Sequence, residues 1–329
     1  MEILVITLIV TNLLLVLLPA VLFWMVRVVA KWMGFKVRYA KFGFFSLALC
    51  LLWTLMALYG YGFGRFRYEV TSVDFADGRI PEAFDGYRIV HISDLHLGGF
   101  KDHEAFVDTI VNSINRLHPD LICFTGDLVS ISHHEAIPFI STLRRLEARD
   151  GVISILGNHD YAVYDRQFQT QEEREKDRAQ LITLERDSMD WRLLLNEPYC
   201  ITHGEDSILI VGLENQACGL HQKVRRGDMG KAMPDSLHTF SILLSHDPSQ
   251  WDAEVVGKTE IPLTLSGHTH AMQFRVFGWT PCRWFYDRSD GLYTLGQQSI
   301  YVNIGLGELM PFRIGATPEV TLLTLKRKY

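Results

Sequence analysis

The chain has 329 residues, 48% of them hydrophobic, and a formal net charge of −6. This length suffices for one large α/β domain or two modest ones, and the acidic balance excludes binding of nucleic acid through a basic surface. Five scattered cysteines without a C-x-x-C pair argue against a disulfide scaffold and against a zinc ribbon.

Two uncharged apolar runs lie within the first sixty or so residues, at 3–26 and 42–63. Each is long enough to cross the hydrocarbon core, which takes about 20 helical residues. The second run ends in Tyr59, Tyr61 and Phe63, aromatic residues typical of a membrane interface. A pair of buried core helices is the alternative, but uncharged runs of this length favour a membrane. We predict a transmembrane hairpin over residues 1–66 and one globular domain over residues 67–329.

The loop between the two runs is basic and contains no acidic residue. Its charges are Arg27, Lys31, Lys36, Arg38 and Lys41. By the positive-inside rule this loop is cytoplasmic, which predicts a two-pass protein of the cell (inner) membrane with an extracytoplasmic C-terminal domain. The first run lacks the basic start of a cleavable signal peptide, so we expect the hairpin to be retained.

From Tyr68 onward, short apolar runs alternate with polar helical stretches, as in an α/β fold. The first half contains predicted strands at 88–92, 121–125 and 152–156. Predicted helices lie at 102–117, 138–148 and 169–189. Six further strands, at 199–202, 207–213, 240–245, 262–266, 300–303 and 319–325, are expected to form a second sheet.

Five short polar motifs stand in order, each directly after a predicted strand. They are Asp94-Leu95-His96, Gly126-Asp127, Gly157-Asn158-His159-Asp160, Ser245-His246 and Gly267-His268-Thr269-His270. Ligands of α/β sheets gather in the loops beyond the strand ends, so we expect these side chains at one rim. Mixed oxygen and imidazole donors suit Mn²⁺, Fe or Zn²⁺ better than Ca²⁺. Two such ions about 3.5–4 Å apart can hold a phosphoryl oxygen.

From about residue 85 to residue 325, the chain resembles the calcineurin-like metallophosphoesterases, whose ordered motifs are D-x-H, G-D, G-N-H-[DE], H and G-H-x-H. It is similar to a bacterial membrane-associated branch of phosphodiesterases, some of which are UDP-2,3-diacylglucosamine pyrophosphatases. The resemblance implies an α/β fold of two β-sheets packed face to face and flanked by helices. It also implies metal-dependent hydrolysis of a phosphodiester or pyrophosphate bond. Since the two apolar runs are expected to hold the domain at the membrane, a lipid-linked phosphoester is the substrate class that we expect.

The resemblance implies a role for each motif residue. Two divalent metal ions, most simply Mn²⁺, would be bound by Asp94, His96 and His270 on one side and by Asn158, His246 and His268 on the other, with Asp127 bridging both. His159 would stabilise or protonate the leaving oxygen, and Asp160 would orient His159. The alternative is a catalytically inactive scaffold or sensor of the same fold that binds a protein partner.

Two places depart from the family pattern. Ser130 stands where many members have the second aspartate of G-D-x-x-D, so the support given by that acid must be absent or come from elsewhere. Ala271 and Met272 stand where close relatives often have two glycines, which predicts a narrower groove.

The segment 274–288 interleaves aromatic and basic residues soon after the last motif. The aromatic residues are Phe274, Phe277, Trp279, Trp284, Phe285 and Tyr286, and the basic ones are Arg275, Arg283 and Arg288. Rings and guanidinium groups suit a lipid headgroup interface. The alternative is that the rings pack this loop onto the second sheet.

Overall fold

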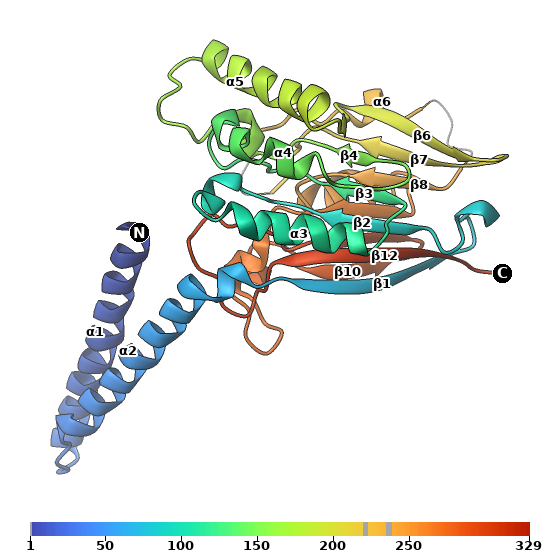
Figure 1. The fold of residues 1–329 in the computed structure, drawn as a ribbon. Helices are drawn as coiled ribbons and strands as arrows, with labels where there is room; N and C mark the ends of the chain where they lie inside the picture. The colour runs from blue at the N-terminus through green and yellow to red at the C-terminus, as the bar shows by residue number, and fades with distance from the viewer. Residues whose placement is uncertain (1, 220–222, 235–238) are drawn as a thin grey trace. The chain divides into compact units, whose positions relative to one another are not determined.

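The computed structural model describes residues 2–219, 223–234 and 239–329, and the chain divides into two compact units. The first unit combines Met1–Arg65 with Met310–Ile314, and the second combines Phe66–Leu309 with Gly315–Tyr329. Long helices dominate the first unit, whereas the second contains two sheets with helices around them (Figure 1).

Two long apolar helices, α1 (Glu2–Trp32) and α2 (Tyr39–Gly62), lie side by side in the first unit (Figure 1). Two side-chain hydrogen bonds join the helices. Trp53 Nε1 donates to Thr11 Oγ1 at 2.7 Å, and Asn12 Nδ2 donates to Thr54 Oγ1 at 3.2 Å. Such bonds satisfy polar groups between helices in a lipid environment. By length and composition, both helices are candidates for membrane spans.

Helix α1 extends beyond the predicted span 3–26 at both ends, and α2 begins three residues before the predicted span 42–63 and ends one residue short of it. The predicted bounds follow the uncharged run, which ends at the first charged side chain. The helical backbone does not end there, because arginine and lysine are good helix formers. Arg27 and Lys31 therefore lie within α1, and Lys41 lies in the first turn of α2.

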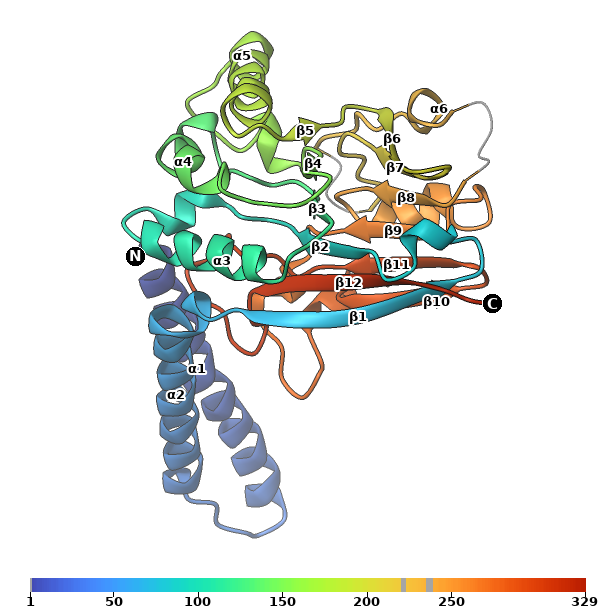
Figure 2. The ribbon, with the colours of Figure 1, turned by 45° about the vertical axis from the view of Figure 1, so that its right-hand side comes forward.

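The second unit contains two mixed sheets of six strands each, so the predicted two-sheet α/β fold is confirmed (Figure 2). In spatial order, the first sheet consists of β1 (Glu69–Asp77), β12 (Glu319–Arg327), β2 (Arg88–Ile92), β3 (Leu121–Phe124), β4 (Val152–Ser154) and β5 (Arg192–Leu193). The second sheet consists of β10 (Gly291–Leu295), β11 (Gln298–Val302), β9 (Leu263–Ser266), β8 (Ser241–Leu244), β7 (Asp206–Gly212) and β6 (Glu197–His203).

The structure corrects one strand assignment and adds three strands. The strand predicted at 319–325 is β12, which lies in the first sheet between β1 and β2 and not in the second. Strands β1, β5 and β10 were not predicted, because their sequences have no clear apolar pattern. All three are edge strands, so much of their surface stays exposed and their apolar pattern is weak.

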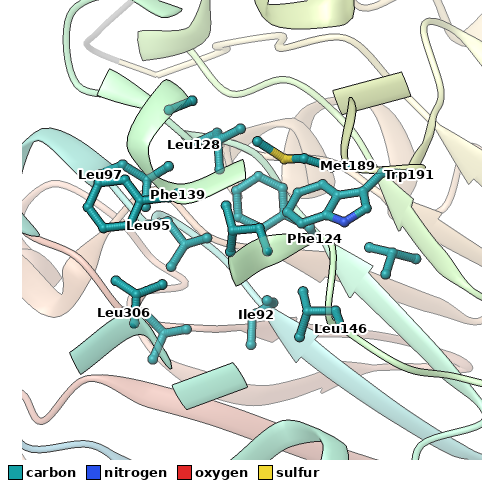
Figure 3. Close-up of a cluster of buried hydrophobic side chains, with 14 of the residues drawn as sticks. Ile92, Leu95, Leu97, Phe124, Leu128, Phe139, Leu146, Met189, Trp191 and Leu306 are labelled. Carbon is teal, nitrogen blue, oxygen red and sulfur yellow. The ribbon is translucent and has the colours of Figure 1, made fainter. Parts of the chain in front are cut away.

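Three apolar layers hold the second unit together. Along β2, Ile89 points into the core between the two sheets, whereas Val90 and Ile92 point to the outer face. On that outer face they pack beneath helices, in a cluster that includes Leu95, Phe124 and Trp191 (Figure 3). Another cluster covers the outer face of the second sheet. Alternating side chains thus bury both faces of both sheets, which fixes the strand register.

The helices of the second unit are α3 (Glu104–Arg116), α4 (Ile140–Leu143), α5 (Gln171–Thr183) and α6 (Met229–Ala232). Helices α3 and α5 confirm two predicted helices, with slightly shorter bounds. The helix predicted at 138–148 is wrong in extent, because only α4 and a preceding 3-10 turn are formed. Helix α5 continues into one π-helical turn, Leu184–Ser188.

Candidate metal centre

The seven predicted ligands all follow the carboxyl ends of strands that run parallel within their sheets. In the first sheet, β2, β3 and β4 lead to Asp94 and His96, to Asp127, and to Asn158. In the second sheet, β8 and β9 lead to His246, His268 and His270. Because parallel strands end at the same edge, both sheets deliver their polar loops to one rim.

A first group of donor atoms comes from Asp94, His96 and His270, all buried, with one atom from each within 4.8 Å of the others. His96 Nε2 lies 3.1 Å from His270 Nε2. The Asp94 Oδ1 atom lies 3.3 Å from His270 Nε2 and 3.9 Å from His96 Nε2. A carboxylate and two imidazoles therefore converge, which is a donor set for a divalent transition metal.

A second group comes from Asp127, His246 and His268. His246 Nε2 lies 3.2 Å from Asp127 Oδ2, 3.2 Å from His268 Nδ1 and 3.1 Å from Asn158 Oδ1. The same Asp127 Oδ2 atom is 3.6 Å from His96 Nε2 of the first group. The Asp127 carboxylate thus lies between the two groups, and the structure brings all seven predicted ligands together.

The loops that carry these groups have strained backbones. Five of the seven predicted ligands have left-handed φ angles: Asp94 (51°), His96 (43°), Asp127 (59°), His268 (73°) and His270 (49°). Such conformations persist only when the surrounding structure holds them, and they cluster at functional sites. Glycines make the close packing possible, since a Cβ on Gly267 would lie 2.3 Å from Asp94 Oδ2.

The imidazole rings are oriented by contacts on the side facing away from the donor groups. His246 Nδ1 lies 2.7 Å from the Thr125 carbonyl oxygen, so its Nε2 faces Asp127. His268 Nε2 lies 2.8 Å from the Tyr286 hydroxyl, so its Nδ1 faces His246. A metal-binding histidine usually has such a partner on its other nitrogen. The contact of Tyr286 with His268 could not be predicted from local sequence, because the two residues are 18 positions apart.

The charge state of the groups suits a divalent cation. Burial opposes ionisation of Asp94 and Asp127, but the neighbouring histidines outweigh it and hold the pKa of both carboxyls below the usual range. Burial lowers the pKa of His96 and of His268. For His246, burial is outweighed by Asp127, and its pKa rises to about 10. Ionised carboxylates and neutral imidazoles bind cations directly, and a cation displaces the proton held by a more basic imidazole.

His159 lies beside the donor groups without belonging to either. Its backbone N–H donates to Asp127 Oδ1 at 2.8 Å, and its ring stacks on Tyr164 with 4.2 Å between centroids. His159 Nδ1 lies 2.7 Å from the Ser130 carbonyl oxygen. A carbonyl oxygen only accepts, so this contact places a proton on Nδ1 and leaves Nε2 for a substrate.

Asp160, which we expected to orient His159, makes its hydrogen bonds with backbone groups of neighbouring loops. Both Asp160 oxygens accept hydrogen bonds from backbone N–H groups, those of Gly157 (2.8 Å), Asp127 (2.7 Å), Leu128 (2.9 Å) and Val129 (3.2 Å). The 3-10 turn His159–Tyr161 directs the carboxyl group of Asp160 into the interior, where it is fully buried. Asp160 therefore supports the strained loop that carries Asp127.

Ser130 fills the position of the absent second acid and contacts the site itself. Its hydroxyl lies 3.3 Å from His96 Nδ1, while its carbonyl oxygen is the partner of His159. Its N–H donates to Glu135 Oε2 at 2.6 Å. The sequence pointed to Ser130 because the family pattern has an aspartate at this position. Nothing in the sequence pointed to Glu135, because it reaches the loop only through a 3-10 turn.

Glu185, in the π-helical turn after α5, is a buried acid close to this region. It accepts a hydrogen bond from Ser154 Oγ at 2.6 Å. Burial, reinforced by the charge of Asp160, raises the pKa of Glu185 to about 8. The folded protein therefore holds a proton that the unfolded chain, with an ordinary glutamate pKa of 4.5, releases. Holding this proton stabilises the folded state. The stabilisation is complete below pH 4.5 and is lost as the pH rises through 8.

We expect Glu185→Gln to raise the free energy of unfolding at pH 9 by on the order of 5 kcal/mol and to change it little at pH 4.5. Glutamine is neutral at every pH and keeps an oxygen for the Ser154 hydroxyl. Thermal unfolding of both proteins across this pH range measures the effect. Parallel curves for the variant and the natural protein would show that Glu185 does not retain its proton.

The second departure, at Ala271 and Met272, lies in strained backbone. Both residues have a φ of 49°, a left-handed conformation that favours glycine. Ala271 is buried in a small cluster with Ile304 and Ala316, whereas Met272 is 47% exposed. The chain therefore keeps two side chains where glycine would relieve strain, and one of them faces solvent. The narrower groove stays a prediction.

Residues 87–272 match the sequence profile of the Calcineurin-like phosphoesterase family. The match spans more than half of the chain, and the chain therefore belongs to this family, whose members use divalent metals to hydrolyse phosphoesters. The resemblance indicated by the five motifs is confirmed.

Several relatives are similar over most of the chain. The "Uncharacterized metallophosphoesterase YkuE" of Bacillus subtilis is 34% identical over 81% of this chain and 90% of its own length. The "Transmembrane protein with metallophosphoesterase domain" of Danio rerio is 28% identical over 88% of this chain, but this covers only 64% of that protein. The "UDP-2,3-diacylglucosamine pyrophosphatase LpxG" of Chlamydia trachomatis is 28% identical over 74% of this chain and 86% of its own length.

Proposed function

We propose that this chain is a membrane-anchored phosphoesterase that uses two divalent metal ions to hydrolyse a phosphodiester or pyrophosphate bond. One observation carries the proposal: the Asp127 carboxylate lies between two groups of converging donor atoms, 3.2 Å from His246 Nε2 and 3.6 Å from His96 Nε2. A carboxylate in this position can serve two cations at once.

In this proposal each ion has its own ligands and Asp127 is shared. The first ion is held by Asp94, His96 and His270, and the second by Asn158, His246 and His268. Oxygen and imidazole donors favour Mn²⁺, with Fe or Zn²⁺ as alternatives. Two bound cations would polarise a phosphoryl oxygen and offset the negative charge of the transition state.

His159 is the proposed general acid. The Ser130 carbonyl oxygen accepts from Nδ1–H at 2.7 Å, so Nε2 is the nitrogen from which the doubly protonated form of the ring would donate. As the bond between phosphorus and the leaving oxygen breaks, the Nε2 proton passes to that oxygen, and the ring remains as the neutral Nδ1–H form. Asp160 acts indirectly in this scheme, by holding the loop of Asp127 through backbone hydrogen bonds.

A lipid-linked phosphoester is the proposed substrate class. The relative LpxG is named for a diacylated sugar nucleotide, and the chain has two helices long and apolar enough to cross a membrane. We propose that residues 1–66 form a two-pass anchor in the cell (inner) membrane and that residues 67–329 form an extracytoplasmic catalytic domain. The basic loop between the helices supports this orientation.

The test combines metal analysis with hydrolysis by the purified full-length protein. We expect two ions per chain, and hydrolysis that is lost with a chelator and restored by Mn²⁺. Simple phosphodiesters, phosphomonoesters and nucleotide-lipid pyrophosphates, assayed in parallel, distinguish the bond that is cleaved. Folded, unchelated protein that contains no metal and hydrolyses none of these would instead support the inactive scaffold or sensor.

A further inference from the structure

An exposed apolar surface lies on the segment between β9 and β10, which we name the aromatic loop (residues 272–288). This segment projects from the sheets as an open loop (orange in Figure 2). Five large apolar side chains on it are exposed: Met272 (47%), Phe277 (105%), Trp279 (40%), Trp284 (72%) and Phe285 (51%). The alternative, in which the rings pack this loop onto the second sheet, is therefore wrong for the four exposed aromatic side chains of this set. A group of this size on one segment marks an interaction surface.

The backbone of the aromatic loop holds this surface in a defined shape. Val276 and Trp279 form an antiparallel bridge. The Val276 N–H donates to the Trp279 carbonyl oxygen at 2.9 Å, and the Trp279 N–H donates to the Val276 carbonyl oxygen at 3.0 Å. Phe277 and Gly278 form the turn between them, with left-handed φ angles of 52° and 75°. A bulky aromatic residue is strained in this conformation, yet its side chain is fully solvent-exposed. Contacts within the folded chain therefore do not explain the position of Phe277.

The base of the aromatic loop is anchored while its aromatic side chains remain outside. Thr280 Oγ1 donates to the Ala271 carbonyl oxygen at 2.6 Å, and Cys282 is fully buried. Above this base the Trp279 and Trp284 rings contact each other edge to face, with 5.2 Å between centroids. The exposed rings thus form a preorganised patch.

This patch adjoins the candidate metal centre. The aromatic loop begins two residues after His270, and the Tyr286 hydroxyl within it lies 2.8 Å from His268 Nε2. Leu309, which is 49% exposed, extends the patch, because its N–H donates to Gln273 Oε1 at 3.0 Å. A partner that covers the patch is therefore brought to the metal centre.

The charge of the aromatic loop is opposite to that of the whole chain. Its three arginines, Arg275, Arg283 and Arg288, and one aspartate, Asp287, give a net charge of +2 in a chain of −6. Arg275 pairs with Asp290 and Arg288 with Asp252, so the cation best placed for an anionic surface is Arg283. Arg283 lies next to Trp284 and is exposed. Basic side chains near a bilayer are attracted to anionic lipids by about 1 kcal/mol each. Tryptophan and phenylalanine rings beside arginine suit the headgroup region, where apolar and polar contacts are available together.

We infer that the aromatic loop is a docking surface for an anionic lipid bilayer, into whose headgroup region Phe277, Trp279 and Trp284 insert. The two helices of the same chain that are long and apolar enough to cross a membrane would keep this unit within reach of a bilayer. Docking brings lipid-linked phosphoesters to the metal centre; this consequence and the membrane anchor rest on the proposed function, whereas the exposed rings do not.

The experiment measures the depth of single sites in the full-length protein, reconstituted into vesicles containing phosphatidylglycerol. Cys50, Cys200 and Cys218 are replaced by serine, which leaves the two buried cysteines. A fluorophore is then attached at Phe277→Cys, or at Leu295→Cys as the control. Leu295 is also exposed, at 52%, but it lies at the far end of β10 from the aromatic loop. Lipids brominated near the headgroup quench only a fluorophore that reaches them.

We expect quenching at position 277 and none at position 295, with less quenching at 277 in the Arg283→Gln variant and in vesicles of phosphatidylcholine alone. Equal, weak quenching at the two positions would overturn the inference and leave a protein partner as the occupant of the patch.

Hydrolysis is measured on the same vesicles. Quenching without hydrolysis contradicts the proposed function alone, and hydrolysis without quenching contradicts the docking surface alone.

Discussion

Asp127→Asn is expected to remove most of the activity and to lower the number of bound ions below two. The Asp127 carboxylate lies between both donor groups, so an amide there removes a negative charge from both cations. The loss of several kcal/mol of charge stabilisation corresponds to a rate decrease on the order of 10³-fold. The fold should persist, because asparagine tolerates the left-handed φ of 59° at this position.

Asp177→Asn is the matched control for this variant. Asp177 is also a buried aspartate paired with a histidine, since its Oδ1 lies 2.6 Å from His133 Nδ1, but it belongs to neither donor group. Metal analysis and turnover are measured on both variants. Two ions and natural turnover in Asp127→Asn would show that the shared carboxylate is not needed, which contradicts the proposed centre.

His159→Ala is expected to lower kcat by roughly 10²–10⁴-fold while the metal content stays unchanged. The ring belongs to neither donor group, and its proposed contribution is made only when the leaving oxygen accepts a proton. The effect should therefore depend on the leaving group. A nitrophenolate leaves without protonation and should reveal a small loss, whereas an alkyl alkoxide needs the proton and should reveal the full loss.

His133→Ala serves as the control for a histidine outside both donor groups, and it should retain metal and turnover. Loss of metal in His159→Ala would make His159 a ligand or a structural support. An equal loss of rate for good and poor leaving groups would exclude general-acid catalysis by this ring.

Order and spacing along the chain were enough to predict much of the site. Each motif follows an apolar run, and the carboxyl ends of parallel strands meet at one edge, so Asp94, Asp127 and His246 could be expected together before any distance was measured. The sandwich fold was predicted in the same way. Its central strands are buried on both faces, which leaves a strong apolar signal in strands such as β3 and β8.

Contacts between distant residues could not be predicted in this way. The sequence places Asp160 beside His159, yet a 3-10 turn directs its carboxyl group to the backbone of the Asp127 loop, over 30 residues away. Tyr286 and Glu135 reach the site through turns whose direction depends on packing elsewhere. A local pattern carries no information about which distant groups a side chain meets.

Residue type and local periodicity were enough to predict the candidate donor residues, their order and the two apolar helices. The place of β12 in the first sheet, the position of Asp127 between the two donor groups and the exposure of the rings of the aromatic loop could be seen only in the folded chain. Strand pairing and exposure depend on which segments meet across long separations in the chain. Which segments meet depends on how much apolar surface the whole core buries, and this cannot be read from any single segment of the sequence.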